Sequence, residues 1–225
     1  MKEYYSARLS AERLKRCYDI APPRIRQYLD AEIQYVLGYV EPHYSVLELG
    51  CGYGRVLSEL IPYSEHVVGI DTSLESLKMA KLLLRSKHNC DLFEMNAAML
   101  GLRENRFDIV VCIQNGISAF KVDPHTLVNE SLRVTSPGGI CLFSSYSDKF
   151  WEDRLEWFRL QSTYGLLGKI DWEATCNGVI ACEDGFRATT YDPSRFEALT
   201  LQMGIESRII EVDNSSVFCV INKQS

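Results

Sequence analysis

A short apolar run that ends in three closely spaced glycines is the feature that most constrains this chain. The segment reads SVLELGCGYGRVLSEL from residue 45. Glycines at positions 50, 52 and 54 let the backbone turn sharply and approach a ligand without a Cβ atom in the way. The helix expected after them presents free N–H groups and partial positive charge at its N-terminus. The pattern therefore predicts a strand, a nucleotide-binding loop and a helix.

The spacing of these glycines separates two classes of nucleotide. Dinucleotide sites carry the pattern G-x-G-x-x-G. Here Gly54 comes only two residues after Gly52, which leaves no room for that pyrophosphate geometry. Glu48, two residues before the first glycine, is also foreign to dinucleotide sites, and it can organise the loop or bind the ammonium group of an amino acid. An adenosine that carries a methionine tail therefore fits this loop better than a pyrophosphate.

A second acidic residue stands where a second strand is expected to end. HVVGID is typical of a buried strand, and its last residue, Asp71, comes seventeen residues after Gly54. A carboxylate at this place can accept two hydrogen bonds from a ribose diol. We therefore predict that Asp71, with Thr72 beside it, binds the ligand. The glycine loop with Glu48 and the strand that ends at Asp71 together indicate this ligand more specifically than either motif does alone.

Strand-like and helix-like segments alternate along most of the chain. Five segments are predicted to be strands and lie at residues 45–50, 66–71, 91–96, 107–115 and 139–146, most of them largely apolar. Amphipathic stretches separate them, and Pro137-Gly138-Gly139 is predicted to turn the chain into the fifth strand. Such alternation predicts an α/β fold with a mainly parallel, doubly wound sheet and helices on both faces.

The alternation is interrupted after Tyr146. Residues 147–190 combine one helical stretch with two or three short strands, so we predict a small α+β cap inserted after the fifth strand. One helix and two strands are expected to follow, at residues 193–203, 205–212 and 216–222. The length of the chain fits one domain over residues 1–225.

Four motifs in this order resemble the class I S-adenosylmethionine (SAM)-dependent methyltransferases, in the group that includes ubiquinone-biosynthesis and small-molecule enzymes. They are VLELGCGYGR at 46–55, GID at 69–71, NAAMLGLRENRFDIV at 96–110 and LRVTSPGGICLF at 132–143. The resemblance implies SAM as cofactor and S-adenosylhomocysteine (SAH) as product. It also implies a Rossmann-like, seven-stranded sheet of order 3-2-1-4-5-7-6 with strand 7 antiparallel.

The resemblance also assigns cofactor-binding residues. Asn96, followed by Ala97, stands where the family usually has an aspartate beside the adenine, and its amide oxygen can still accept a hydrogen bond. The loop after strand four is expected to line the methionine end of the cofactor with Gln114, Asn115, Gly116 and Ile117. The glycine loop contributes Glu48, Gly50, Cys51, Gly52 and Gly54.

The N-terminal residues 1–40 are predicted to be helical, with a break at Pro22-Pro23. In similar enzymes this segment often folds over the cofactor, so we expect a helical lid that brings Tyr18 to the cofactor. The alternative is a helix that only packs on the sheet.

The acceptor side is less well defined by the sequence. Tyr146 ends the fifth strand, and Trp151 and Tyr191 belong to an aromatic-rich stretch near the strand ends, where open α/β sheets bind ligands. Each could touch a substrate, or could instead pack the cap onto the sheet. Tyr146 and His125 are the candidates for a catalytic acid or base, although a histidine in the first turn of a helix is more commonly solvated.

Composition narrows the range of partners. The formal net charge of -6 and the scattered cations do not favour nucleic acid. No apolar stretch approaches the roughly 20 residues of a membrane span, and the N-terminus lacks a signal-peptide pattern. We therefore expect a cytoplasmic protein that does not bind membranes and whose eight cysteines are reduced. Without a CxxC pair, no metal site is expected. The oligomeric state stays open.

We therefore predict an enzyme, a SAM-dependent methyltransferase that transfers the methyl group to a small-molecule acceptor by in-line displacement. Two alternatives remain. A protein or RNA methyltransferase should have a basic or extended groove at the strand ends, and a non-catalytic SAM-binding module should have a pocket closed at the methyl group. The residues do not determine which acceptor is used, or which of its atoms attacks.

Overall fold

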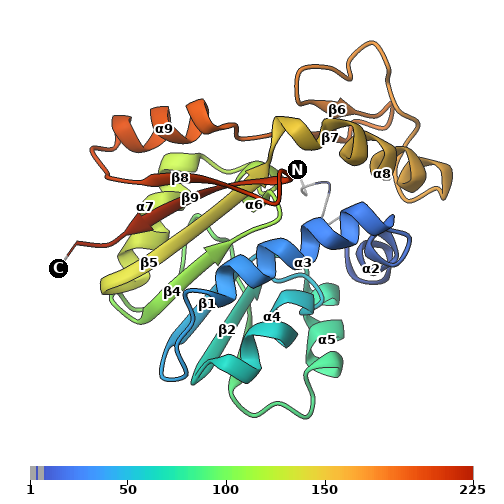
Figure 1. Cartoon of the computed structure of the whole chain (residues 1–225). Helices are drawn as coiled ribbons and strands as arrows, with labels where there is room; N and C mark the ends of the chain where they lie inside the picture. Colours follow the sequence, from blue (N-terminus) through green and yellow to red (C-terminus); the bar gives the residue numbers. More distant parts are fainter. Residues whose placement is uncertain (1–3, 5–7, 225) are drawn as a thin grey trace.

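The computed structural model describes residue 4 and residues 8–224 (Figure 1). The strands are β1 Ser45–Leu49, β2 His66–Asp71, β3 Cys90–Glu94, β4 Phe107–Cys112, β5 Thr135–Tyr146, β6 Ile180–Ala181, β7 Arg187–Ala188, β8 Arg208–Val212 and β9 Ser216–Asn222. The α-helices are α2 Ala11–Asp19, α3 Pro23–Leu37, α4 Arg55–Leu60, α5 Leu74–Leu83, α6 Gly116–Ala119, α7 Pro124–Val134, α8 Trp151–Thr163 and α9 Pro193–Gln202. Within the described residues, no helix has the length and apolar character that a membrane crossing requires.

The main sheet has seven strands in the order β3-β2-β1-β4-β5-β9-β8. β9 runs antiparallel to β5 and β8, while the other pairs are parallel. The predicted order 3-2-1-4-5-7-6 is therefore confirmed, since β6 and β7 form a separate small sheet. β8 and β9 are joined at Asp213 and Asn214, whose φ angles of 56° and 51° are typical of the tight turns that join antiparallel strands.

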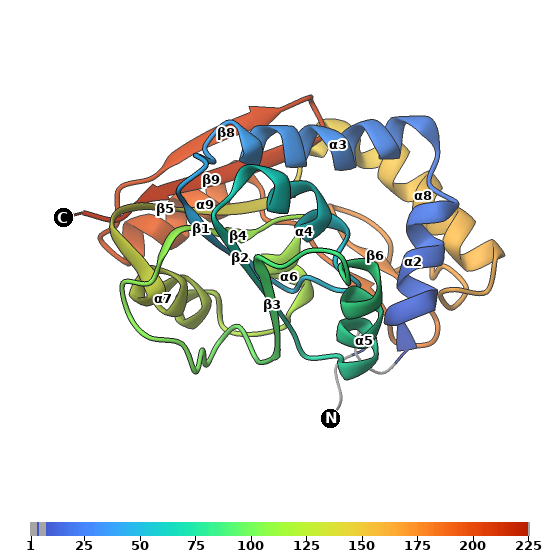
Figure 2. The same cartoon turned by 90° about the horizontal axis from the view of Figure 1, so that it is seen from below.

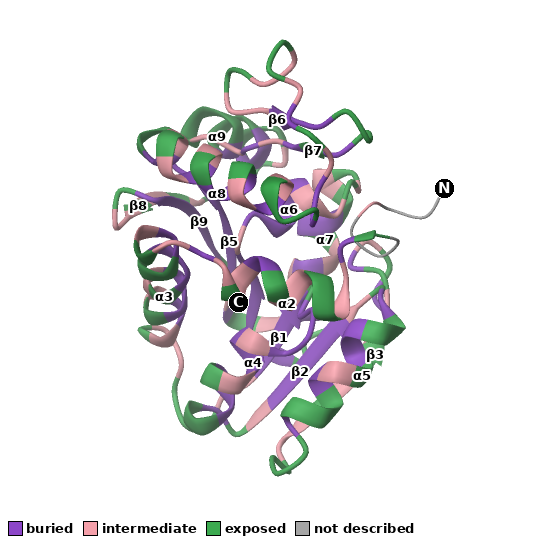
Figure 3. Cartoon of the chain, turned by 90° about the vertical axis from the view of Figure 1, so that its right-hand side faces the viewer, coloured by how far each residue is buried: buried purple, intermediate pink, exposed green. Residues whose placement is uncertain are grey.

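Alternate residues of the central strands face two different helical layers. Val46 and Val111 belong to a core shared with α3, α4 and α5, whereas Leu47 and Val110 belong to a core shared with α7 and α9. Figure 3 shows these central strands in the colour of buried residues and exposed residues on the outer sides of the helices. Burial on both faces explains why the strand segments are apolar almost throughout.

A third core joins the N-terminal helices to the segment after β5. It brings α2 and the start of α3 against α8 and the β6–β7 pair, and α2 and α8 lie next to each other in Figures 1 and 2. One hydrogen bond ties them directly, because the Trp157 indole N–H donates to the Cys17 carbonyl oxygen at 2.9 Å. These elements lie beyond the carboxyl ends of the parallel strands. The first residues of the predicted 1–40 lid fall outside the described part of the chain.

The predicted bounds of strands four and five differ from the observed ones. Strand five was predicted to begin at Gly139 but begins at Thr135, because Thr135 already pairs with Phe107 and the register then shifts. Gly138, with a φ of 78°, and Gly139 exchange backbone hydrogen bonds with Lys223, so the glycines form an irregularity inside the strand.

Strand four was predicted to reach residue 115 but ends at Cys112. Gln114 and Asn115 have φ angles of 55° and 64°, which a strand does not allow. The short helix α6 begins directly after them.

Gly69, in the middle of β2, sets how closely α4 approaches the sheet. A Cβ atom there would lie 2.5 Å from Leu57 Cδ1 and 2.9 Å from Cys51 Sγ. We expect Gly69→Ala to lower the free energy of unfolding by about 1–3 kcal/mol through overpacking, measured by urea denaturation. Gly101→Ala is the control, because its Cβ would only meet Met95 Cε at 3.7 Å. Equal stability of the two variants would contradict this account of the packing.

Candidate functional site

The glycine loop after β1 forms a cradle that side chains would fill. Gly50 and Gly52 have φ angles of 73° and 53°. A Cβ atom on Gly50 would lie 2.5 Å from the Phe120 ring, so only glycine fits. The N–H groups of Gly50 and Cys51 both donate to the Ile70 carbonyl oxygen, at 2.8 and 2.9 Å. The loop is therefore anchored to β2 and leaves its open side to a ligand.

Asp71 at the end of β2 faces the same loop. Its Oδ2 accepts a hydrogen bond from the Gly52 N–H at 2.9 Å, and its Oδ1 accepts one from the Ser73 N–H at 2.8 Å. Burial raises the pKa of this carboxyl, and the hydrogen bonds from backbone N–H groups oppose that effect. An ionised carboxylate has about four acceptor sites, so each oxygen of Asp71 can accept a further hydrogen bond from a ligand.

Glu48 is a buried carboxylate with an unused oxygen. The residue is 4% exposed, and its Oε2 has no hydrogen-bond partner among the described residues. Burial raises the pKa of Glu48 to about 8, while the Arg55 guanidinium acts to lower it. An unpaired buried carboxylate is costly, so a cationic ligand group at this position would stabilise it.

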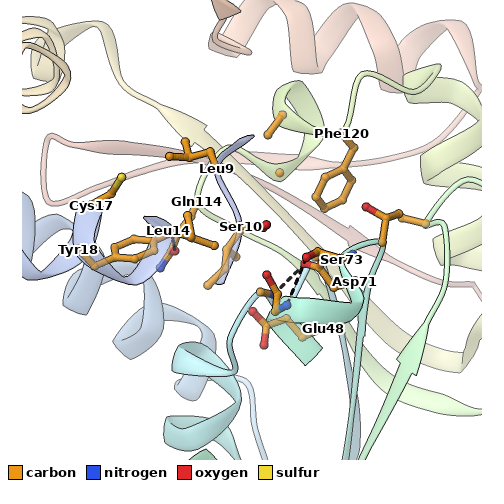
Figure 4. Close-up of a pocket in the computed structure, with 18 of the residues that line it drawn as sticks. Leu9, Ser10, Leu14, Cys17, Tyr18, Glu48, Asp71, Ser73, Gln114 and Phe120 are labelled. Carbon is orange, nitrogen blue, oxygen red and sulfur yellow. Dashed lines mark hydrogen bonds between the residues drawn. The ribbon is translucent and has the colours of Figure 1, made fainter. Parts of the chain in front are cut away.

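These groups line one cavity at the carboxyl ends of β1, β2, β4 and β5 (Figure 4). The structure brings eleven of the predicted site residues into its wall, namely Tyr18, Glu48, Gly50, Gly52, Asp71, Thr72, Asn96, Ala97, Gln114, Gly116 and Tyr146. In Figure 4, Glu48, Asp71 and Ser73 gather at the glycine loop, and Tyr18, Leu14 and Gln114 lie together on the other side. The cavity thus has an acidic end and an aromatic end.

Four predicted cofactor residues lie behind the cavity wall. Cys51 packs in the core beneath the loop, and Ile117 packs in the core on the other face of the sheet. Gly54, with a φ of 88°, starts α4, and a Cβ on it would lie 3.1 Å from Ala80 Cβ. The Asn115 side chain donates to the Thr189 carbonyl oxygen at 2.9 Å and accepts from the Ser145 hydroxyl at 2.8 Å. Their contacts are with the protein and shape the loops.

Three predicted acceptor-side residues lie apart from the cavity. His125 is in the first turn of α7, where its Nε2 lies 3.2 Å from Gln202 Oε1 and its Nδ1 lies 3.5 Å from Asp123. Trp151 lines a separate hollow. Tyr191 packs on Phe196, with ring centres 5.3 Å apart. Of the predicted acceptor-side candidates, Tyr146 alone lines the cavity.

A buried glutamate that sequence reasoning missed holds the loop after β4. Glu32 on α3 is fully buried, and it accepts hydrogen bonds from the Gln114 N–H and the Ser216 hydroxyl, both at 2.7 Å. The Gln114 N–H also donates to Ser144 Oγ at 2.9 Å. Glu32 therefore fixes the left-handed backbone that directs Gln114 into the cavity. A glutamate on a predicted amphipathic helix carried no signal of this role.

The aromatic end of the cavity comes from elements that are distant in sequence. Tyr28 on α3, together with Trp157, Phe158 and Gln161 on α8, lines it with Tyr18 and Tyr146. Burial raises the pKa of Tyr18 to about 12 and raises that of Tyr146 further. Both hydroxyls therefore stay protonated near neutral pH. The aromatic composition of residues 147–190 was visible in the sequence, but which rings reach the cavity depends on how α8 packs.

A family model described as a methyltransferase domain matches residues 47–143, the part of the chain that holds the glycine loop, Asp71 and Gln114. This part of the chain is therefore similar to a methyltransferase domain. A ubiquinone biosynthesis O-methyltransferase from Psychrobacter cryohalolentis is 27% identical over 124 residues, which cover 53% of this chain and 48% of that protein. A demethylmenaquinone methyltransferase from Geobacillus stearothermophilus is 33% identical over 132 residues, which cover 55% of each chain.

The chain spans about half the length of the curated relatives it matches. Among solved structures, the PH0226 protein from Pyrococcus horikoshii aligns over 100% of both chains with a TM-score of 0.67 and 22% identity. That likeness shows a common fold that includes the main sheet, the N-terminal helices and the segment after β5.

The buried carboxyl of Glu32 predicts a pH-dependent stability. Burial raises its pKa from 4.5 to about 7, so an unfolded chain releases this proton at lower pH than the folded chain. The free energy of unfolding should therefore fall as pH rises through this window, by up to about 3 kcal/mol. Urea denaturation of Glu32→Gln between about pH 5 and pH 8 should lack this component.

Other groups near Glu32 titrate in both proteins, so the difference between wild type and variant is the quantity to compare. Glu59→Gln, at an exposed position, is the matched control and should follow the wild-type curve. A constant difference between wild type and Glu32→Gln across the window would show that the Glu32 pKa is not raised.

Proposed function

We propose that this protein is a SAM-dependent methyltransferase that acts on a small-molecule acceptor. The observation that carries this proposal is the pairing, in one cavity, of a glycine cradle with two acidic groups, the half-buried Asp71 and the buried Glu48, that each have an unused acceptor site. Asp71 keeps capacity for a ribose diol, and Glu48 keeps an unpartnered oxygen for an ammonium group. SAM carries both of these groups.

The remaining wall of the cavity fits the rest of SAM. Met95 and Asn96 follow β3 and line the cavity beside Asp71. Asn96 Oδ1 already accepts from the Ala98 N–H at 2.8 Å, and it retains a second acceptor site for the adenine amine. Asn96, Asp71 and Glu48 would therefore hold the adenine, ribose and methionine parts in turn.

When bound, SAM, held by Asn96, Asp71 and Glu48, would supply an activated methyl group to a lone pair of the acceptor, and the electron pair of the carbon–sulfur bond would return to sulfur. The task of the protein is to align the acceptor and to exclude water. Gln114, at the junction of the two ends of the cavity, would stand next to this reaction. Tyr146 stays protonated and can donate a hydrogen bond there, but it cannot serve as a base near neutral pH.

The shape and lining of the aromatic end support a small molecule as the acceptor. It is enclosed by α2, α3 and α8 and is not a basic groove of the kind a nucleic acid needs. The quinone-pathway names of the two relatives point the same way. The cavity continues past Gln114, which favours an enzyme over a SAM-binding module with a closed pocket.

The lid and the cap have related roles in this proposal. Residues 1–40 would cover the cofactor, since Leu14 approaches within 3.1 Å of a Cβ built on Gly52 and the Ala11 N–H donates to Ser76 Oγ at 2.9 Å. Residues 147–190 would close the acceptor end. The side chain of Arg13 in the lid bonds to the cap, because it donates hydrogen bonds to the carbonyl oxygens of Gly165 and Leu166, each at 2.8 Å.

Removal of the Asp71 carboxylate should abolish most of the cofactor affinity. We expect Asp71→Ala to weaken SAM and SAH binding about 10- to 100-fold, because hydrogen bonds to a charged group contribute roughly 1.5–3 kcal/mol each. Isothermal titration calorimetry measures this change. Asp71→Asn keeps one acceptor oxygen, so its affinity for SAM and SAH should lie between those of wild type and Asp71→Ala.

Asp91→Ala removes an exposed carboxylate whose partner is His66 at 3.1 Å, and it should bind SAH like wild type. Unchanged affinity in Asp71→Ala would rule out the proposed cofactor site.

The raised pKa of Glu48 predicts that a proton is released when the cofactor binds. Its pKa of about 8 keeps it largely protonated at pH 7, whereas an adjacent ammonium group favours the carboxylate. Binding of SAH at about pH 7 should therefore release close to one proton, and affinity should rise with pH up to about 8, the pKa of Glu48 in the free protein. Calorimetry in buffers of different ionisation enthalpy counts the protons.

Glu48→Gln should bind SAH without this release, and the exposed Glu65→Gln should retain it. Equal proton release by Glu48→Gln and wild type would assign the ammonium contact to another group.

A further inference from the structure

We propose that the acceptor is an uncharged aromatic molecule with an oxygen atom that accepts a hydrogen bond from the Gln114 side-chain amide. This inference rests on the proposed function and deepens it, because it names the chemical class that the aromatic end of the cavity selects. Three properties of that end carry it: its walls, its charges and the unused amide donor of Gln114.

The walls are built from aromatic rings. Tyr18 and Trp157 face each other with ring centres 6.0 Å apart, and Tyr28 and Tyr146 have ring centres 5.3 Å apart. Phe158 completes the enclosure and is 4% exposed. Flat rings at these distances favour offset or edge-to-face contacts with another ring, worth about 0.5–1.5 kcal/mol beyond the burial of area. A planar aromatic acceptor therefore fits this end better than an aliphatic chain.

The charges exclude an ionic acceptor. The carboxylates of the cavity wall, Glu48 and Asp71, lie at the glycine loop, and none of the side chains that line the aromatic end is acidic or basic. Two guanidinium groups pack against the rings of this end. The guanidinium carbon of Arg55 lies 4.8 Å from the ring centre of Tyr18, and that of Arg154 lies 4.4 Å from the ring centre of Tyr146.

A positively charged amine would therefore be buried between two cations. The carboxyl behind this wall, Glu32, already accepts hydrogen bonds from the Gln114 N–H and the Ser216 hydroxyl. A carboxylate would meet ring faces rather than the guanidinium groups behind them. Either ion would lose its hydration without a compensating partner, which is far more costly than the transfer of a neutral molecule.

Gln114 supplies the donor. Gln114 lines the cavity, and its Oε1 accepts from the Tyr18 hydroxyl at 3.3 Å. Its Nε2 atom is buried and has no hydrogen-bond partner among the described residues. The Trp157 indole N–H, by contrast, is already used by the Cys17 carbonyl oxygen. In Figure 4, Gln114 lies beside Tyr18 and apart from Glu48 and Asp71. A buried unsatisfied amide donor costs about 1–3 kcal/mol, and an oxygen on the acceptor would remove that cost.

Four probes with one ring system test this class in the SAH-saturated protein. They are 2-naphthol, 2-methylnaphthalene, 2-naphthoate and 2-naphthylmethylammonium, titrated by calorimetry at about pH 7, where the naphthol is neutral. We expect 2-naphthol to bind about tenfold or more tightly than both ions, and about fivefold or more tightly than 2-methylnaphthalene.

Variants of Gln114 separate its amide from the shape of the cavity. Gln114→Leu should lose most of the preference for 2-naphthol over 2-methylnaphthalene, and any remainder would come from the Tyr28 and Tyr146 hydroxyls. Gln114→Glu, of the same size, should improve binding of the ammonium probe about tenfold. Gln202→Leu, at an exposed position on α9, is the matched control and should keep the wild-type order of affinities.

The outcomes distinguish this inference from the proposed function. If SAH binds but an ionic probe binds as tightly as 2-naphthol, or no probe binds, the acceptor class is wrong and the SAM site stands. Failure of SAH itself to bind overturns both. If the Gln114 variants do not fold, as judged by thermal denaturation, the order of the four probes in the wild type decides.

Discussion

The hydrogen bond from the Gly52 N–H to the Asp71 carboxylate is the contact on which the site depends. It joins the loop after β1 to the tip of β2 at 2.9 Å, while the Ile70 carbonyl oxygen holds the same loop through Gly50 and Cys51. Parallel strands bring these two tips to one edge of the sheet, and glycine lets the loop pass between them. Because Asp71 uses one acceptor site for the loop, it both shapes the cradle and remains available to a ligand.

The loop after β4 is the second constraint, and it connects the cofactor end to the acceptor end. Its two left-handed residues are held from opposite sides: Glu32 on α3 binds the Gln114 backbone, and Asn115 binds Ser145 and the Thr189 carbonyl oxygen. Left-handed backbone in non-glycine residues costs free energy and persists where surrounding contacts hold it. The N-terminal helices and the segment after β5 are thus both attached to this loop, the first through Gln114 and the second through Asn115.

Most of the sheet could be predicted from the sequence because its signals are local. Apolar runs of strand length, the glycine spacing and the acidic residue at the end of HVVGID depend on neighbouring residues only. The strand order followed from the family resemblance, and the antiparallel last strand fits the tight turn at Asp213 and Asn214. The errors came at Gly139 and at Gln114, where backbone pairing with Lys223 and a buried glutamate, both distant in sequence, decide the conformation.

The sequence by itself determined the nucleotide cradle, because Glu48, the glycines and Asp71 lie within one strand–helix–strand unit whose geometry is fixed by short-range rules. Only the tertiary structure decided the acceptor end. Tyr18, Tyr28, Tyr146 and Trp157 come from four separate elements, and whether a ring faces a cavity or a core depends on how those elements pack. The same holds for Trp151, Tyr191 and His125, whose types suited a substrate site but whose helices and loops carry them elsewhere. Side-chain chemistry can be read from a sequence, whereas the convergence of distant side chains requires the fold.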